Sequence, residues 1–178
     1  PEVIFHLAAI VSGEAELDFE GFNAFAMEKG WGDGLPLVPP TESRVRMFLS
    51  ENDRYPDEVI AHLPPSRAEC TVEKIAINAV MAGAQPESLE LLIAMVAAIA
   101  DPDFELYGIN TTTAPVYPAF VVNGPIRDEL DIPYSYGCFG GVATRANAIG
   151  RAMRLIMRNV AGQVAGVTSQ TTFGSPGR

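Results

Sequence analysis

Apolar residues recur every three or four positions in several stretches of the chain, which is the spacing of one face of an α-helix. Residues 71–82 show this spacing, and Thr71 stands where a side-chain oxygen would cap the helix. Residues 87–100 predict the most apolar helix, since Pro86 is tolerated in a first helical turn. Residues 144–160 predict a helix whose polar side is arginine. Two shorter helices are predicted at residues 22–29 and 44–49, the second capped by Thr41.

Short apolar runs bounded by turn-forming residues predict strands at residues 58–63, 104–110 and 119–123. Helices and strands that are intermixed along a chain predict an α/β or α+β fold, here layered helices on a small mixed sheet. A length of 178 residues fits a single domain with a substantial core. The hydrophobic fraction of 48% excludes a disordered chain.

Residues 2–11 predict a buried strand that ends in small residues, His6-Leu-Ala-Ala among them. This segment resembles, over about residues 1–20, the extended short-chain dehydrogenases beside their nicotinamide cofactor. The glycine-rich turn that seats the pyrophosphate is missing, and no Tyr-x-x-x-Lys pair follows, so nicotinamide binding is not expected. We expect residues 1–21 to be an appended segment, joined near Gly21 and Phe22 to an unrelated α/β domain over 22–178. The alternative is a true N-terminal strand of this fold.

Few residues could hold a metal ion or a disulfide. The two cysteines, Cys70 and Cys138, fit neither a disulfide scaffold nor a Cys-x-x-Cys motif, and His6 and His62 have no ligand-type cluster nearby. No metal site and no cofactor are therefore expected. The most apolar stretch, residues 89–100, is too short to span a bilayer, and no signal-peptide pattern opens the chain. We expect a soluble cytoplasmic protein without a membrane partner.

Charge is unevenly distributed along the chain. The net charge is −10, yet residues 132–178 contain five arginines and no acid, which leaves −15 on residues 1–131. Such asymmetry indicates a docking surface or a charged-ligand site, or a basic helix that packs beside acidic segments of the same fold. Nucleic acid is excluded as a partner, because an overall −10 opposes its phosphate backbone.

The glycine-rich turn at residues 137–141 precedes the basic helix and is the strongest functional signal. A helix N-terminus offers free N–H groups and partial positive charge, and glycines let a ligand approach the backbone closely. Arginine can grip a carboxylate or phosphate with two parallel hydrogen bonds. We therefore predict a site for a small polar or anionic molecule, or alternatively a solvated helix face. The candidate binding residues are Gly140, Gly141, Arg145 and Asn147.

Cys138 lies inside the same turn, beside a helix start and near Arg145 in sequence. Such a setting favours the thiolate, so Cys138 is a candidate nucleophile; the alternative is a small buried hydrophobe. Asp33, between two glycines, is a second catalytic candidate, or else a structural clamp of its loop. Cys70 directly precedes a helix cap and is interpreted as structural.

Four further polar residues follow predicted strands. Ligands gather beyond strand ends in layered α/β domains, so these side chains could complete the polar site. Alternatively, they satisfy turns, since threonine and asparagine do so commonly. They are Thr111, Thr112, Thr113 and Asn123.

Four longer runs carry a family resemblance: residues 31–41, 71–83, 123–126 and 147–152. Together they resemble the C-terminal region of the UGSC (seleno)proteins, over about residues 22–178. The resemblance implies a thiol or selenol redox role, although the Sec-Gly-Ser-Cys motif of the family is absent here and Ala84 stands where members often have cysteine. It also implies that the chain is part of a longer protein. Edges that such a cut exposes would favour association, so we expect a homo-oligomer.

The sequence features are compatible with three functions. The first is an enzyme for a small polar or anionic substrate, bound at the glycine-rich turn. The second is a hydrolase of an ester, amide or glycosidic bond that uses Cys138 or paired carboxylates. The third is a non-catalytic oligomeric module in which helices 87–100 and 144–160 pack against other copies. The carboxylate pairs considered are Asp101 with Asp103 and Glu69 with Glu73.

Overall fold

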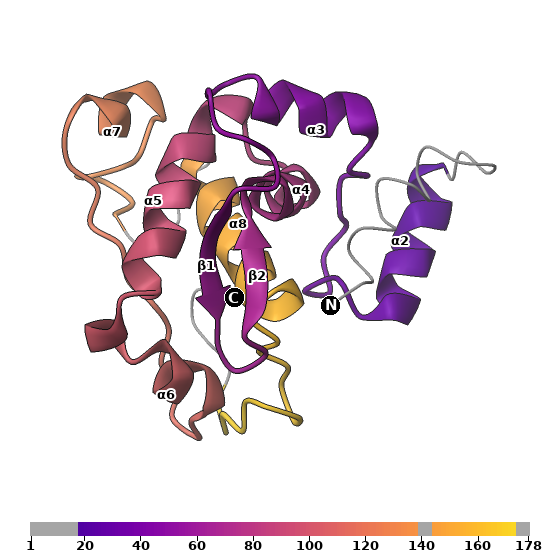
Figure 1. Ribbon diagram of the computed structural model, residues 1–178, viewed down its shortest axis with the longest axis vertical. Coiled ribbons are helices and arrows are strands. Elements are labelled where there is room, and N and C mark those ends of the chain that lie inside the picture. Colours follow the sequence, from indigo (N-terminus) through magenta and orange to yellow (C-terminus); the bar gives the residue numbers. More distant parts are fainter. Residues whose placement is uncertain (1–17, 139–143, 174–178) are drawn as a thin grey trace.

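A computed structural model of the chain describes residues 18–138 and 144–173. This part of the chain contains seven α-helices, α2 to α8, and one antiparallel pair of strands, β1 and β2. It is a single domain of mixed helix and strand, as predicted. Figure 1 shows α4 (Val72–Ala82) in the middle, behind the strands, with α5 (Leu89–Ile99) to one side, α3 (Glu42–Leu49) across one end and α8 (Ala146–Asn159) behind.

Helix α4 is the centre of the core. All of its residues except Glu73 are buried. Its ends match the sequence prediction: the Thr71 hydroxyl accepts the Lys74 N–H, and Gly83 ends the helix in the left-handed conformation at φ 80°. An apolar helix capped at both ends can be buried because no backbone group at its termini is left unpaired.

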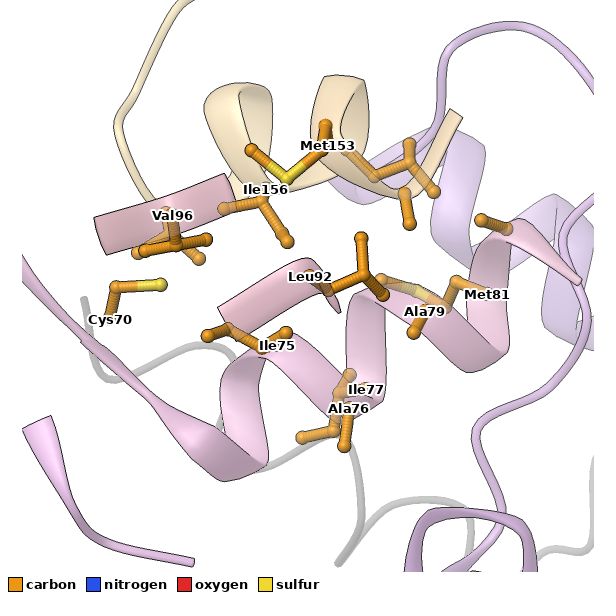
Figure 2. Close-up of a cluster of buried hydrophobic side chains, with 14 of the residues drawn as sticks. Cys70, Ile75, Ala76, Ile77, Ala79, Met81, Leu92, Val96, Met153 and Ile156 are labelled. Atoms are coloured by element: carbon orange, nitrogen blue, oxygen red, sulfur yellow. The ribbon is translucent and has the colours of Figure 1, made fainter. Parts of the chain in front are cut away.

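Helices α5 and α8 pack on α4 and on each other. Figure 2 shows Ile75 of α4, Leu92 and Val96 of α5, and Met153 and Ile156 of α8 in one buried apolar cluster. The arginines of α8 are partly exposed, while its apolar residues are buried, which gives the helix the amphipathic character that the sequence predicted. Helix α5 likewise buries its large apolar side chains in this core. The residues that α5 exposes include Ala94, Ala97 and Ala98. These two helices therefore bury apolar faces within the chain.

The two strands form a hairpin over the same core. Strand β1 (Val59–Leu63) pairs antiparallel with β2 (Ala68–Thr71), with Ala61 opposite Cys70 and Leu63 opposite Ala68. An irregularity between Val59 and Ala61 shifts the register. Leu63 and Cys70 are fully buried, so one face of the hairpin closes the core.

The remaining elements lie at the periphery (Figure 1). Helix α2 (Phe19–Lys29) runs through the predicted junction at Gly21 and Phe22 and buries Phe22. The other peripheral elements are two 3₁₀ turns, η1 (Pro86–Ser88) and η2 (Pro102–Phe104), and the short helices α6 (Leu106–Thr111) and α7 (Pro125–Glu129). The predicted strand in residues 2–11 lies outside the described residues.

Two strand predictions are wrong. Residues 104–110, predicted as a strand, form the end of η2 and most of α6. Leu106 and Asn110 are both buried, and their spacing of four positions is that of one helix face. Residues 119–123 have no regular structure, because the chain there runs along the surface without a partner strand. Strand β2 and helix α7 were not predicted.

A buried amide pair links the two central helices. Asn78 is fully buried on α4; its Nδ2 donates to the Lys74 carbonyl at 2.8 Å, and its Oδ1 accepts from Asn159 Nδ2 of α8 at 2.8 Å. Buried amides need such partners because an unpaired polar group loses its hydration without compensation.

We predict that Asn78→Ala lowers the free energy of unfolding by about 1–3 kcal/mol, because the change leaves the Asn159 amide unpaired beside a cavity. Urea denaturation measures the change. Asn123→Ala is the control, since Asn123 is exposed and its loss should change stability by less than about 0.5 kcal/mol. Equal effects of the two variants would show that the amide pair does not hold α4 and α8 together.

Candidate functional site

A polar pocket of about 350 Å³ lies where the C-terminal end of α4 meets the start of α8. We call it the anion pocket. The sequence predicted two of its residues, Arg145 and Asn147. The rest of the lining comes from both helices and the segments beside them: Ala82, Gly83, Gln85, Thr144, Ala148 and Arg151.

The start of α8 differs from the expected open helix N-terminus. Arg145 precedes the helix in a helical conformation, and no side chain caps it. The Asn147 and Ala148 N–H groups donate to the Thr144 and Arg145 carbonyls at 3.3 and 3.2 Å. These backbone donors are therefore already used by the chain, and attraction for an anion must come chiefly from side chains.

Arg145 places an exposed positive charge at this pocket. Its side chain is exposed, and Nη1 donates to Gln85 Oε1, an uncharged acceptor, at 2.7 Å. Among the described residues, no ion pair involves Arg145. The Thr144 hydroxyl in the same pocket is buried and has no hydrogen-bond partner within the described part of the chain. The pocket thus contains an unneutralised guanidinium, and the Thr144 hydroxyl is buried beneath its lining.

Arg151, about one and two-thirds turns further along α8, has a carboxylate partner of its own. Its Nε and Nη2 donate to the two oxygens of Asp33, both at 2.9 Å, and Nη2 also donates to the carbonyls of Leu35 and Pro36. The side chains are only 17% exposed for Arg151 and 6% for Asp33. This clamp holds the loop of residues 31–37 against α8. At Arg151, the structure therefore fits the alternative interpretation of the charge asymmetry, in which the basic helix packs beside an acidic group of the same fold.

The clamp also sets the protonation state of Asp33. Burial alone raises the pKa of this carboxyl. The hydrogen bonds from Arg151 and Leu35 and the Arg151 charge more than offset that effect and hold the pKa below its usual value. A carboxylate held ionised, with both oxygens bonded, is a poor general base, so the position of Asp33 favours the structural alternative.

A second pocket, of about 380 Å³ and mostly apolar, lies beside the first. We call it the apolar pocket. Leu91 and Met95 of α5, Ile149 and Gly150 of α8, and the extended segment 117–122 line it. Cys138 lines it too and is exposed, so the alternative of a buried cysteine is wrong there. Asn147 lines both pockets.

Cys70 differs sharply from Cys138. It is fully buried, and burial raises the pKa of its thiol to about 12, with the Lys74 charge opposing the shift. Cys70 is therefore a protonated core side chain at neutral pH, in line with its structural interpretation.

The threonines of residues 111–113 do not join this site. The Thr111 hydroxyl donates to the Tyr107 carbonyl, and the Thr112 hydroxyl accepts the Ala114 N–H. The carbonyls of Thr112 and Thr113 accept N–H groups from Gln170 and Thr172. These contacts fit the turn-satisfying alternative. The strand that would have directed the threonines toward a ligand does not exist.

Asn123 is exposed and precedes Gly124, whose φ of 93° starts the turn into α7. It lines neither pocket, and the predicted strand before it is absent. Gly140 and Gly141 lie outside the described residues. The carboxylates considered for hydrolysis also lie away from both pockets: Asp101 caps η2, and Glu69 faces His62 across the hairpin at 3.8 Å.

Two further results concern ligands and membranes. The described residues include no group of three or more histidine, cysteine, aspartate or glutamate side chains that could hold a metal ion. In residues 18–138 and 144–173, no helix is both long and apolar enough to cross a bilayer.

Sequence reasoning missed Gln85, Thr144 and the apolar pocket apart from Cys138 and Asn147. Gln85 stands between the glycine that ends α4 and Pro86, so a polar side chain at a helix–helix corner was the available signal. The apolar pocket had no local signal, because its lining residues come together only in the folded chain.

Comparisons with protein-family models, curated proteins and solved structures find no match to this chain.

We predict that Asp33→Asn destabilises the protein by about 3 kcal/mol at pH 7, because it removes one charge of a mostly buried pair. A depressed carboxyl pKa contributes stability above the unfolded-state value, near 3.8, and that contribution disappears as pH falls through the folded-state pKa. The stability difference between the parent and the variant should therefore shrink below about pH 4. Urea denaturation between pH 7 and pH 2.5 measures it.

Glu42→Gln is the matched control, since it removes a carboxylate from the exposed pair with Arg46. Its effect should stay below about 0.5 kcal/mol at every pH. A difference for Asp33→Asn that stays constant down to pH 2.5 would contradict the clamp's electrostatic role.

Proposed function

We propose that this protein binds a small anionic molecule in the anion pocket, with Arg145 as the principal contact. One observation carries the proposal: an exposed guanidinium beside the pocket, hydrogen-bonded to a neutral amide and not to a carboxylate. Arginine binds carboxylates and phosphates through paired N–H donors, and Gln85 can hold the guanidinium in position while its remaining donors meet the ligand.

The Asp33–Arg151 clamp supports this proposal in two ways. It fixes the start of α8 relative to the end of α4, because Arg151 Nη1 also lies 3.5 Å from the Ala82 carbonyl. It also neutralises the second arginine that lines the pocket, so that an incoming anion has Arg145 as its unneutralised cation.

Three of the four sequence runs that resemble the UGSC family also meet at this site, whereas residues 123–126 line neither pocket. Residues 31–41 supply Asp33, residues 71–83 supply the end of α4, and residues 147–152 supply Asn147 and Arg151. We propose membership of that family on these runs. The same convergence favours a ligand site at the anion pocket over a solvated helix face. The carboxylates of the hydrolase alternative line neither pocket, so that alternative would depend on Cys138, which lines the apolar pocket.

We predict that sulfate and phosphate raise the melting temperature of the protein and that Arg145→Gln weakens their binding. The loss should be about 1.5–3 kcal/mol, or roughly 10- to 150-fold in Kd, the range for a charge-assisted hydrogen bond. Isothermal titration calorimetry at constant ionic strength measures the Kd, and thermal shift measures the stabilisation.

Arg158→Gln is the matched control. Arg158 is on the same helix and also donates to a neutral acceptor, the Gly30 carbonyl, but it lies about 20 Å further along the axis. It lines a different pocket, beside α2, so its loss should leave binding in the anion pocket unchanged. Equal effects of the two variants, or no stabilisation of the parent by either anion, would refute the proposed function.

A further inference from the structure

The anion pocket and the apolar pocket meet at the first turn of α8. Asn147 lines both, and Arg145, in the anion pocket, is followed directly by Ala146, in the apolar pocket. Their linings are chemically opposite, with an unneutralised guanidinium on one side and aliphatic and aromatic side chains on the other. One ligand that crosses the start of α8 would therefore meet a cation at one end and apolar surface at the other.

The cation inside the apolar pocket is already engaged. The Arg127 guanidinium stacks on the Tyr134 ring, 4.0 Å from its centroid, and forms an ion pair with Asp128. Arg127 is thus neutralised and in contact with an aromatic face. Of the two arginines, Arg145 is the one left to receive a negative charge.

We propose that the two pockets form one composite site for a monocarboxylate with an apolar body, either an aryl-alkyl chain or a branched alkyl chain. The proposal rests on the function proposed above and adds the substrate class. The carboxylate lies at Arg145 and the apolar body lies against Met95, Phe120 and Ile149. A volume of about 380 Å³ equals that of roughly a dozen water molecules at ~30 Å³ each, which is enough for a small apolar body.

An inorganic anion fills only half of this arrangement. It leaves the apolar lining in contact with water, whereas an apolar body removes that surface from water and gains affinity in proportion to its length. Each buried methylene is worth roughly a fourfold gain in affinity. The composite site therefore predicts that affinity rises with chain length at constant charge.

Cys138 reports whether the apolar pocket is occupied. It is exposed on the lining of that pocket, while Cys70 is fully buried, so native-state alkylation should label Cys138 alone of the two. A ligand body in the apolar pocket should slow the labelling, and sulfate in the anion pocket should not.

Gly150 offers a way to fill the apolar pocket without crowding the chain. It lies in α8 on the pocket lining, and a Cβ added there meets no atom within 4 Å. Gly108 in α6 is the matched control, because it is also an exposed helical glycine whose added Cβ meets nothing within 4 Å, and it lines neither pocket. Gly150→Leu and Gly108→Leu therefore make the same chemical change in two places.

The experiment titrates the full chain with acetate, butyrate, hexanoate and 3-phenylpropionate at constant ionic strength, beside sulfate. Kd is measured by calorimetry, and the rate of iodoacetamide labelling is measured by intact mass. We expect affinity to rise about fourfold per methylene from acetate to hexanoate. Hexanoate and 3-phenylpropionate should slow Cys138 labelling. Gly150→Leu should reduce their affinity to that of acetate without changing sulfate binding, and Gly108→Leu should change neither.

The two proposals fail in different ways. If sulfate binds through Arg145 but affinity is independent of chain length, or saturating 3-phenylpropionate leaves Cys138 labelling unchanged, the composite site is refuted and the proposed function stands. If the longer carboxylates lose affinity with Arg127→Gln and not with Arg145→Gln, the pockets are separate sites and the composite site is again refuted. If no anion binds, both proposals fall.

Discussion

The burial of α4 is the constraint on which the rest of the structure depends. A helix with ten buried residues out of eleven needs cover on every side, and α3, α5, α8 and the hairpin supply it. Its two polar interior side chains are satisfied locally: Lys74 Nζ donates to the Glu69 carbonyl, and the Asn78 amide bonds within α4 and to α8. The candidate site forms where this buried helix ends and the chain turns, at Gly83 and Gln85.

The arginines of α8 show how one charged helix face serves different purposes. Arg151 is directed to Asp33 and holds a loop, while Arg154 hydrogen-bonds Gln163. Burial lowers the pKa of Arg154, the Arg158 charge lowers it further, and Asp33 opposes both. Arg158 meets the Gly30 carbonyl. Arg154 and Arg158 also meet neutral acceptors and also line pockets, but they are partly buried. Arg145 differs from them because its side chain is exposed at its pocket.

The apolar pocket has a related origin. Residues 119–123 are rich in valine and phenylalanine, as a strand would be, but they run without a partner strand beside α5 and α8. Val121 is 87% exposed, so the side chains on this segment are only partly covered by the fold. An extended apolar segment that lacks a sheet leaves a hollow against the helices, and that hollow is the apolar pocket.

The sequence by itself determined the main helices and their caps, because helical spacing, Thr41 and Thr71 act within a few residues. It also singled out Arg145 and Asn147 through the charge and glycine pattern. It did not determine whether residues 104–110 form a helix or a strand, since a short apolar run fits both periods and packing decides between them. Only the tertiary structure decided which arginine meets Asp33, 118 positions away, and which residues line the two pockets. Those contacts join distant parts of the chain, and no local pattern encodes a pairing between them.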